Sequence, residues 1–455
     1  MKLNLHPEAA KNFNEKAEGL LLAIEKRPRP RQRRPEGPLE PDIHIAANIL
    51  PEDIIGDVHT TLTDAFGNEI AKTFESDSEL IGLFDDNHKK LIRIAEGMQK
   101  VKTLASVVSV ELLSDLIFEW IKLKYGAAPV APIAEYVLAE CEKQIQETEI
   151  WVPVFMLHVQ SDITVGRVTL KTITRAMLDE WRVGFFTHAK DDATISAVEQ
   201  FITKQRGKLQ GFAAATIRQV AEPRRASELA FEEAEQAVAL LRFFSPANFN
   251  PRIISYCELL GRQHIDSAKY LTVRDGRIQE YFTGVLDHTE PAWPLSNVAI
   301  ADIRSNGLDT LSHLLTKERH TDFQQELLAA LQLYAKSSLA KDISDKLVYI
   351  LVALESLFLR DGSEPIVDNI SERMAFFAGS TIVERKGIIS NVKKTYGLRS
   401  SYIHHGRRID IDDLTILEEF MLTAWRCLQA LIGYAASDSA SKTAFLDELE
   451  ERKLA

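Results

Sequence analysis

The chain has 455 residues, of which 45% are hydrophobic and 26% are charged, a composition typical of a soluble globular protein. This length exceeds what one compact core usually holds and predicts two or three domains. The formal net charge of -12 excludes a general nucleic-acid coat protein, because that class needs a broadly basic surface. Any contact with nucleic acid must therefore come from a local basic patch.

The N-terminal sequence has no apolar run after a charged start, which argues against a secretory signal, and no stretch approaches the roughly 18 apolar residues of a membrane span. Cys141, Cys257 and Cys427 lie far apart and fit neither a disulfide framework nor a paired-cysteine metal site. We therefore expect a cytoplasmic protein without a membrane partner, in which the cysteines are small buried residues.

The first region, residues 1–148, is expected to be helical. Apolar residues recur three and four positions apart through most of 50–147, and Pro132 lies near an expected helix start. Residues 26–41 interrupt this pattern with a basic, proline-rich sequence. Prolines lack a backbone donor and like charges repel, so we expect an extended, solvated connector there.

The pattern of residue types changes near residue 149. Stretches rich in β-branched and aromatic residues alternate with polar turns, and the pair Asp275–Gly276 is a strong hairpin signal. Between the expected strands, residues 227–244 have the spacing of an amphipathic helix. Residues 149–305 are therefore predicted to form a mixed α+β domain with an antiparallel sheet.

From residue 306 onward the strand pattern disappears. Six stretches have helical spacing, and Gly406 ends one of the longest. Residues 306–455 are therefore predicted to form a helical bundle. The whole chain is expected to be α+β and predominantly α.

Several signatures of catalysis are absent from the sequence. It contains no phosphate-binding glycine loop, no HExxH zinc motif and no GxSxG serine nucleophile, so no cofactor and no metal are expected. Asp410, Asp412 and Asp413 lack the glycine and the later glutamate of a calcium-binding loop and suit the start of a helix better. Enzymatic chemistry, if present, should rest on histidine.

One segment is basic within this acidic chain. Residues 384–408 carry seven basic side chains and one acidic side chain, hence a charge of +6 before histidines are counted. Such a local excess suits a phosphodiester, although a solvated helix face has the same composition.

The same segment contains "RSSYIHHG", in which His404 follows Arg399 by five positions. Histidine exchanges protons near neutral pH, and the planar guanidinium of arginine can hold phosphate oxygens at two points. These are the groups that RNA cleavage without a metal requires. The spacing alone is weakly specific, because Arg182 and His188 form a second match that we attribute to chance.

The wider pattern adds specificity. An apolar helix containing "ALESLFL", a second containing "ISERMAFF", the motif "RSSYIHHG" and a closing apolar helix resemble the HEPN superfamily, in particular its Apea-like branch. That family carries an Rx4–6H motif, with a polar residue after the arginine, on a helical bundle. The resemblance covers about 340–432, roughly a fifth of the chain.

The resemblance implies that Arg399 and His404 form a metal-independent ribonuclease site supported by the Ser400 hydroxyl. It also implies a homodimer through the C-terminal helical domain, because HEPN enzymes pair two bundles around one cleft. Helix geometry agrees with this requirement: residues five apart on a straight helix point about 140° away from each other. Convergence within one chain would need a distortion, for which Gly397 is a candidate.

Further residues are candidates for supporting roles. Those expected to hold substrate are His405, Tyr402, Arg407, Arg408 and Lys394. Tyr402 also suits a packing role. Glu355 lies in the middle of an apolar helix, where it could orient Arg399 across the bundle or simply be an acid on the helix surface.

The favoured hypothesis is thus a HEPN endoribonuclease that cleaves RNA by attack of the 2′-hydroxyl. Apea-like HEPN proteins are associated with bacterial antiphage defence, which implies a gated activity that arrests growth and answers a phage-derived or protein trigger. The alternative is a non-catalytic HEPN module that binds RNA or a nucleotide and scaffolds a dimer. A third hypothesis, a purely structural helical protein, applies if the resemblance is accidental.

Overall fold

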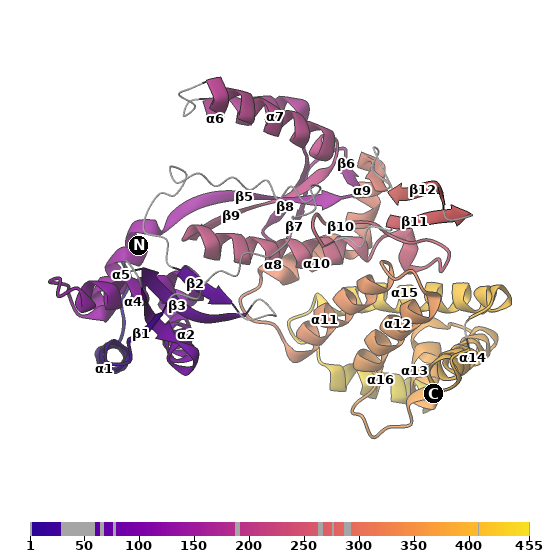
Figure 1. The fold of residues 1–455 in the computed structure, drawn as a ribbon. Helices are drawn as coiled ribbons and strands as arrows, with labels where there is room; N and C mark the ends of the chain where they lie inside the picture. Colours follow the sequence, from indigo (N-terminus) through magenta and orange to yellow (C-terminus); the bar gives the residue numbers. More distant parts are fainter. Residues whose placement is uncertain are drawn as a thin grey trace. The chain divides into compact units, whose positions relative to one another are not determined.

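The computed structural model describes residues 2–28, 60–63, 68–75, 79–186, 192–262, 267–274, 277–285, 293–407 and 409–454. The chain divides into two compact units, residues 1–148 with 218–229 and residues 149–217 with 230–455. The predicted fold class is confirmed: the described residues form an α+β fold that is predominantly helical (Figure 1).

The first unit contains a four-stranded antiparallel sheet with strand order β1-β4-β3-β2. Its strands are β1 (Glu25–Pro28), β2 (Thr60–Thr63), β3 (Glu69–Glu75) and β4 (Glu79–Phe84). Helix α2 packs on β3 and β4. The helices of this unit are α1 (Pro7–Leu21), α2 (Asp85–Gln99), α3 (Lys102–Ala105), α4 (Val110–Tyr125) and α5 (Ile133–Gln144).

The expectation that residues 50–147 are helical is wrong at this sheet. A charged residue occupies a core position in β3: Lys72 is 5% exposed, donates to the Ser114 hydroxyl at 3.2 Å and pairs with Asp115. This buried cation hides the alternation that identifies a strand. Residues 26–28 of the expected basic connector belong to β1, and residues 29–41 lie outside the described residues.

The second unit begins with the predicted sheet, whose five strands have the order β10-β5-β9-β8-β7. Its strands are β5 (Gln146–Phe155), β7 (Ile163–Val165), β8 (Val168–Thr172), β9 (Ala213–Ala221) and β10 (Glu258–Leu259). Two residues connect β7 to β8, and the first of them, Gly166, has a φ of 64°. A side chain there would also meet Leu315, because an added Cβ lies 2.9 Å from the Leu315 Cβ.

Two smaller strand pairs accompany this sheet. β6 (Leu157–Val159) pairs in parallel with β13 (Trp293–Leu295), and β11 (Ser267–Arg274) pairs antiparallel with β12 (Arg277–Val285). The second pair is the predicted hairpin; its turn, Asp275–Gly276, lies outside the described residues. The helices between the strands are α6 (Arg175–Phe186), α7 (Asp192–Leu209) and α8 (Pro223–Arg242).

The helical bundle predicted for the C-terminal region is present (Figure 1, orange to yellow). Its helices are α9 (Asn297–Ile303), α10 (Asp309–Thr316), α11 (Asp322–Ser337), α12 (Ile343–Phe358), α13 (Ile366–Ala378), α14 (Ile382–His405), α15 (Leu414–Ala435) and α16 (Lys442–Leu454). Short turns of other helix types lie at Pro246–Asn248, Arg304–Leu308 and Ile411–Asp413. Within the described residues, no helix is long and apolar enough to cross a membrane.

One continuous hydrophobic core joins the sheet and the bundle of the second unit. It extends from Val152 and Leu170 in the strands, through Leu354 of α12, to Phe445 of α16. The C-terminal helix is thus packed on the bundle. The three cysteines are free and buried, as predicted, and burial raises the pKa of each thiol to about 12.

A buried arginine fastens α13 to its surroundings. Arg373 is 3% exposed and holds Glu364 with two hydrogen bonds of 2.7 and 2.8 Å. It also donates to Glu450 of α16 at 3.1 Å and to the Phe358 carbonyl at 2.6 Å. The Arg373 guanidinium lowers the pKa of Glu364 to about 2.

Because the folded-state pKa of Glu364 lies below its ordinary value, this carboxylate stabilises the fold at neutral pH. That contribution is lost as the pH falls through about 4.5 toward about 2. We expect Glu364→Gln to lower the free energy of unfolding by about 1–3 kcal/mol at pH 7, and by less at pH 3.5. Urea unfolding at both pH values measures this difference.

The matched control is Glu448→Gln. Glu448 pairs with Arg452 on the surface of α16, where both side chains are about half exposed, so a change of less than about 0.5 kcal/mol is expected. Equal effects of the two substitutions at pH 7 would contradict a special role for the Arg373 cluster.

Candidate active site

The motif lies on α14, an unbroken helix of 24 residues. Thr381 and Glu384 form a reciprocal capping box at its start, and Gly406, with a φ of 63°, ends it in the left-handed conformation. The backbone stays helical through Gly397. The distortion considered at Gly397 is therefore absent, and Arg399 and His404 point about 140° apart on one helix.

Arg399 lies on the partly buried side of α14, one turn after Tyr396. Tyr396 is 6% exposed, and its hydroxyl donates to Glu355 of α12 at 3.0 Å. Burial first, and then the Glu355 carboxylate, raise the pKa of Tyr396, whereas the positive charge of Arg399 lowers it. Glu355, Tyr396 and Arg399 therefore form one electrostatic cluster.

Glu355 was considered as a residue that orients Arg399, but its hydrogen-bond partner in the structure is a different residue of α14. Its hydrogen bond goes to Tyr396, and Tyr396 lies one turn before Arg399 on the same helix. The guanidinium of Arg399 makes no hydrogen bond or ion pair with another described residue, and its Nε is buried without a partner. An unsatisfied buried donor has a cost.

The other motif residues lie near the end of α14. Ser400, His404 and His405 are exposed, and Tyr402 is half-buried. The two histidines occupy the last helical turn. Arg399 and Tyr396 thus form one part of the motif and the histidines another, and a single chain does not bring the Arg399 and His404 side chains together.

The basic segment is partly neutralised by its neighbours. Lys393 pairs with Asp368 at 2.7 Å, and the exposed Arg407 lies 3.8 Å from Asp410. Arg385 stacks on the ring of Phe376. Lys386 and Lys394 are exposed and make no ion pair within the described part of the chain, whereas Arg408 lies outside it.

The second Arg–His match in the sequence has a different setting. Arg182 lies on α6 and pairs with Glu199, and His188 lies outside the described residues. Among the described residues, no group of three or more histidine, cysteine, aspartate or glutamate side chains is arranged to hold a metal ion. Asp413 precedes α15 without a side-chain capping bond, so the expected cap is not made by that residue.

Tyr396 is not among the site residues predicted from the sequence. Its hydroxyl connects Glu355 of α12 to α14, the helix that carries Arg399. The available signal was its position three residues before Arg399, on the same helix face. No protein-family model, no curated protein and no solved structure matches the chain.

The hydrogen bond between Tyr396 and Glu355 can be measured with a double-mutant cycle. Tyr396→Phe and Glu355→Ala should each destabilise the protein, with a coupling energy of about 0.5–1.5 kcal/mol because both remove the same bond. Urea unfolding of the two single variants and the double variant gives this coupling.

The matched control is Tyr349→Phe. Tyr349 is 36% exposed on α12, and its hydroxyl makes no hydrogen bond within the described residues, so its loss should leave the free energy of unfolding unchanged. Additive effects of Tyr396→Phe and Glu355→Ala would mean that the bond does not form in solution.

Proposed function

We propose that the chain is a metal-independent endoribonuclease of the HEPN type. The observation that carries the proposal is the arginine on α14. Arg399 is partly buried beside Tyr396, its guanidinium has no protein partner among the described residues, and two exposed histidines follow on the same helix. An arginine kept without an acidic partner is suited to a phosphate.

The proposed reaction uses two histidines, one from each of two chains. One imidazole removes the proton of the RNA 2′-hydroxyl, and the 2′-oxygen forms a bond to phosphorus. The bond from phosphorus to the 5′-oxygen breaks, and the second histidine gives that oxygen a proton. The products are a 2′,3′-cyclic phosphate and a 5′-hydroxyl, and Arg399 stabilises the charge on the phosphate oxygens.

The undistorted helix is the reason for invoking a second chain. Since Arg399 and His404 diverge by about 140° within one protomer, a two-fold axis beside α14 would let the motifs of two copies face each other. Much of α14 is open: three of its 24 residues are buried, Val392, Thr395 and Tyr396. Side chains added at Gly387 and Gly397 would meet nothing within 4 Å.

Supporting roles follow from position. Ser400 would assist Arg399 by hydrogen bonding, and His405, Tyr402 and Lys394 would contact the RNA beside the reacting phosphate. Arg407 would have to leave its long contact with Asp410 to do so. Arg408 is proposed for the same role from the sequence alone. We extend the proposal to a gated activity in antiphage defence or growth arrest, released by a phage-derived or protein trigger.

The decisive experiment is cleavage of a mixed RNA panel in the presence of EDTA. We expect His404→Ala to slow cleavage by about 10²–10⁴-fold, because it removes a general acid or base, and Arg399→Ala to have an effect of similar size. His313→Ala is the matched control, since His313 is exposed on α10. Equal cleavage by the wild type and His404→Ala would contradict the proposal. RNA binding without cleavage by the wild type would support the scaffold alternative.

The two-chain site can be tested at Gly397. Leucine there has open space in a single chain and should favour the helix by about 0.5–1 kcal/mol, yet it would obstruct a second chain packed along α14. We expect Gly397→Leu to give a stable protein that sediments as a monomer and loses cleavage.

The matched control is Gly433→Leu, because Gly433 is also exposed on a helix, α15, with nothing within 4 Å. It should keep both dimer and activity. A Gly397→Leu variant that cleaves RNA at the wild-type rate would rule out close packing along α14.

A further inference from the structure

A pocket of about 390 Å³ lies between α1 and α2 in the first unit. Its walls come from these two helices and from Ala23, which follows α1. The volume falls within the range of small-molecule sites, which begins at about 300 Å³. The motif on α14 belongs to the other unit, so this pocket is separate from the candidate active site.

The pocket exists because large side chains fill one end of the helix pair and small ones line the other. Phe13 of α1 packs on Gly97 of α2, since a Cβ added at Gly97 would lie 3.6 Å from the Phe13 ring. Farther along α1, the wall consists of Gly19 and Ala23. A Cβ added at Gly19 would meet nothing within 4 Å. The space is therefore open without a ligand.

The floor of the pocket is apolar. Leu20 of α1 is 2% exposed and Ile94 of α2 is 6% exposed, and both line the pocket. No aromatic ring is among the lining residues, so a nucleobase would have no stacking partner there. The floor suits an aliphatic group.

The rim of the pocket is basic. The two helices run in opposite directions, because Ala23 after the end of α1 and Asn87 near the start of α2 line the same pocket. One turn from the contact between Phe13 and Gly97, α1 therefore reaches Lys16 and α2 reaches Arg93. These two cations lie at the same end of the pocket, on facing helices.

The two cations at this end are available to a ligand. Lys16 and Arg93 are exposed and make no ion pair or hydrogen bond with another residue of the described ranges. A third cation, Lys90, instead donates to the Asn87 side chain at 3.0 Å. The lining residues include no aspartate and no glutamate, so the anion that these charges attract must come from outside the pocket.

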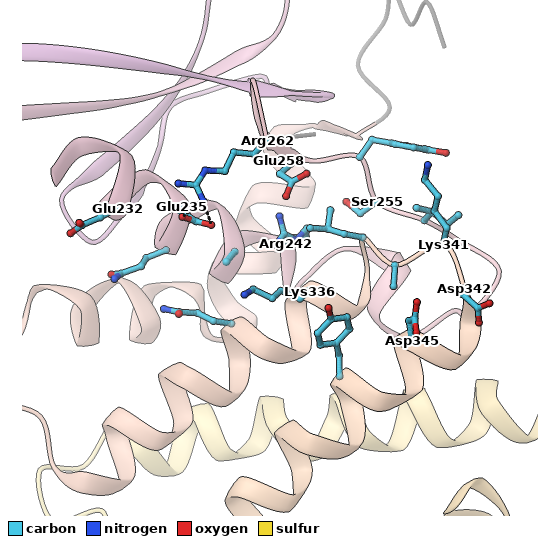
Figure 2. Close-up of a pocket in the computed structure, with 18 residues that line it drawn as sticks. Glu232, Glu235, Arg242, Ser255, Glu258, Arg262, Lys336, Lys341, Asp342 and Asp345 are labelled. Carbon is cyan, nitrogen blue, oxygen red and sulfur yellow. Dashed lines mark hydrogen bonds and ion pairs between the residues drawn. The ribbon is translucent and has the colours of Figure 1, made fainter. Parts of the chain in front are cut away.

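The larger cavity of the second unit, about 1000 Å³, has a different charge arrangement. Glu232 and Glu235 lie at one end of it, Asp342 and Asp345 lie at the other, and Arg262 is paired with Glu235 at 3.2 Å (Figure 2). Carboxylates thus accompany the cations of that cavity. The pocket between α1 and α2 has three cations and no carboxylate.

The dimensions of the pocket select the ligand further. The seven residues from Lys16 to Ala23 span about 10 Å along a helix axis, the length of an extended carboxylic acid of about eight carbons. A folded protein partner would cover about 800 Å² of surface, much more than a pocket of this volume provides. A short aliphatic chain with one anionic group matches the length, the floor and the rim.

We propose that this pocket binds the anion of a medium-chain fatty acid, with its carboxylate on Lys16 and Arg93 and its alkyl chain over Leu20 toward Ala23. The carboxylate is ionised at neutral pH, so both contacts are charge-assisted. The acid is held as a ligand, and no bond is made or broken. The site does not depend on the proposed ribonuclease activity.

Isothermal titration calorimetry of the full chain with octanoate, octanol and acetate tests the proposal. We expect saturable binding of one octanoate per chain. Octanol should bind about tenfold more weakly or worse, because it lacks the charge that the two cations attract. Acetate should bind about 100-fold more weakly or worse, because it lacks the aliphatic chain that the floor buries.

Three variants address the residues of the pocket. Lys16→Gln and Arg93→Gln should each weaken octanoate binding about fivefold or more, because each removes one charge-assisted contact. Gly19→Leu should weaken it about tenfold or more by filling the space for the alkyl chain. Since Gly19 has open space beside it, this variant should fold, and its thermal unfolding verifies that it does.

The matched controls are Lys89→Gln and Gly207→Leu. Lys89 is adjacent to Lys90 on α2 but pairs with Asp86 at 3.2 Å and does not line the pocket. Gly207 is exposed on α7 with nothing within 4 Å of an added Cβ. Both variants should bind octanoate as the wild type does.

The proposal would be overturned by any of four results. The first is the absence of saturable octanoate binding; binding of phosphatidylglycerol vesicles that Arg93→Gln weakens would then assign the basic rim to a lipid surface. The second is acetate binding as tight as octanoate binding, and the third is octanol binding as tight as octanoate binding. The fourth is octanoate binding that Arg93→Gln and Gly19→Leu both leave unchanged, which would place the ligand elsewhere.

Discussion

The continuity of α14 constrains everything proposed for the motif. A capping box fixes the start of this helix and a left-handed glycine fixes its end, so the intervening backbone keeps a regular turn. On a regular turn the arginine and the histidine of the motif diverge. The proposed chemistry needs both groups at one phosphate, and a second copy would supply the missing group without any distortion of the helix. The same regularity places Arg399 one turn after Tyr396, where the helix meets α12.

Helix α12 is fastened at its start and contacts the motif helix farther along. In its first turns, the buried Lys346 donates to the Ile253 carbonyl. Six residues after Tyr349, about 9 Å along the helix axis, Glu355 accepts the hydrogen bond from Tyr396. Because a packed helix moves largely as one body, a displacement of the start of α12 would also act on the contact beside Arg399.

The helices of the bundle could be predicted because their apolar residues follow one regular period, and the β11–β12 hairpin because its turn sequence is distinctive. The sheet of the first unit could not. A lysine is buried in β3 and satisfied by Ser114 and Asp115, 42 and 43 residues later, and nothing local indicates such a partner. Glu355 and Tyr396, 41 residues apart, show the same limit. Their positions in the helices were predictable, but their contact depends on how α12 and α14 pack.

The charge of the motif segment shows why composition alone overestimates the positive charge that a surface offers to a ligand. The sequence places an excess of +6 between residues 384 and 408, yet Lys393 is paired with Asp368, and Arg407 lies near Asp410. An exposed ion pair attracts an approaching phosphate less than an isolated cation does. Arg399, by contrast, has a partly buried guanidinium without an acidic partner, so less water screens its charge. The proposed affinity of this region for RNA should therefore depend on a few positions around Arg399.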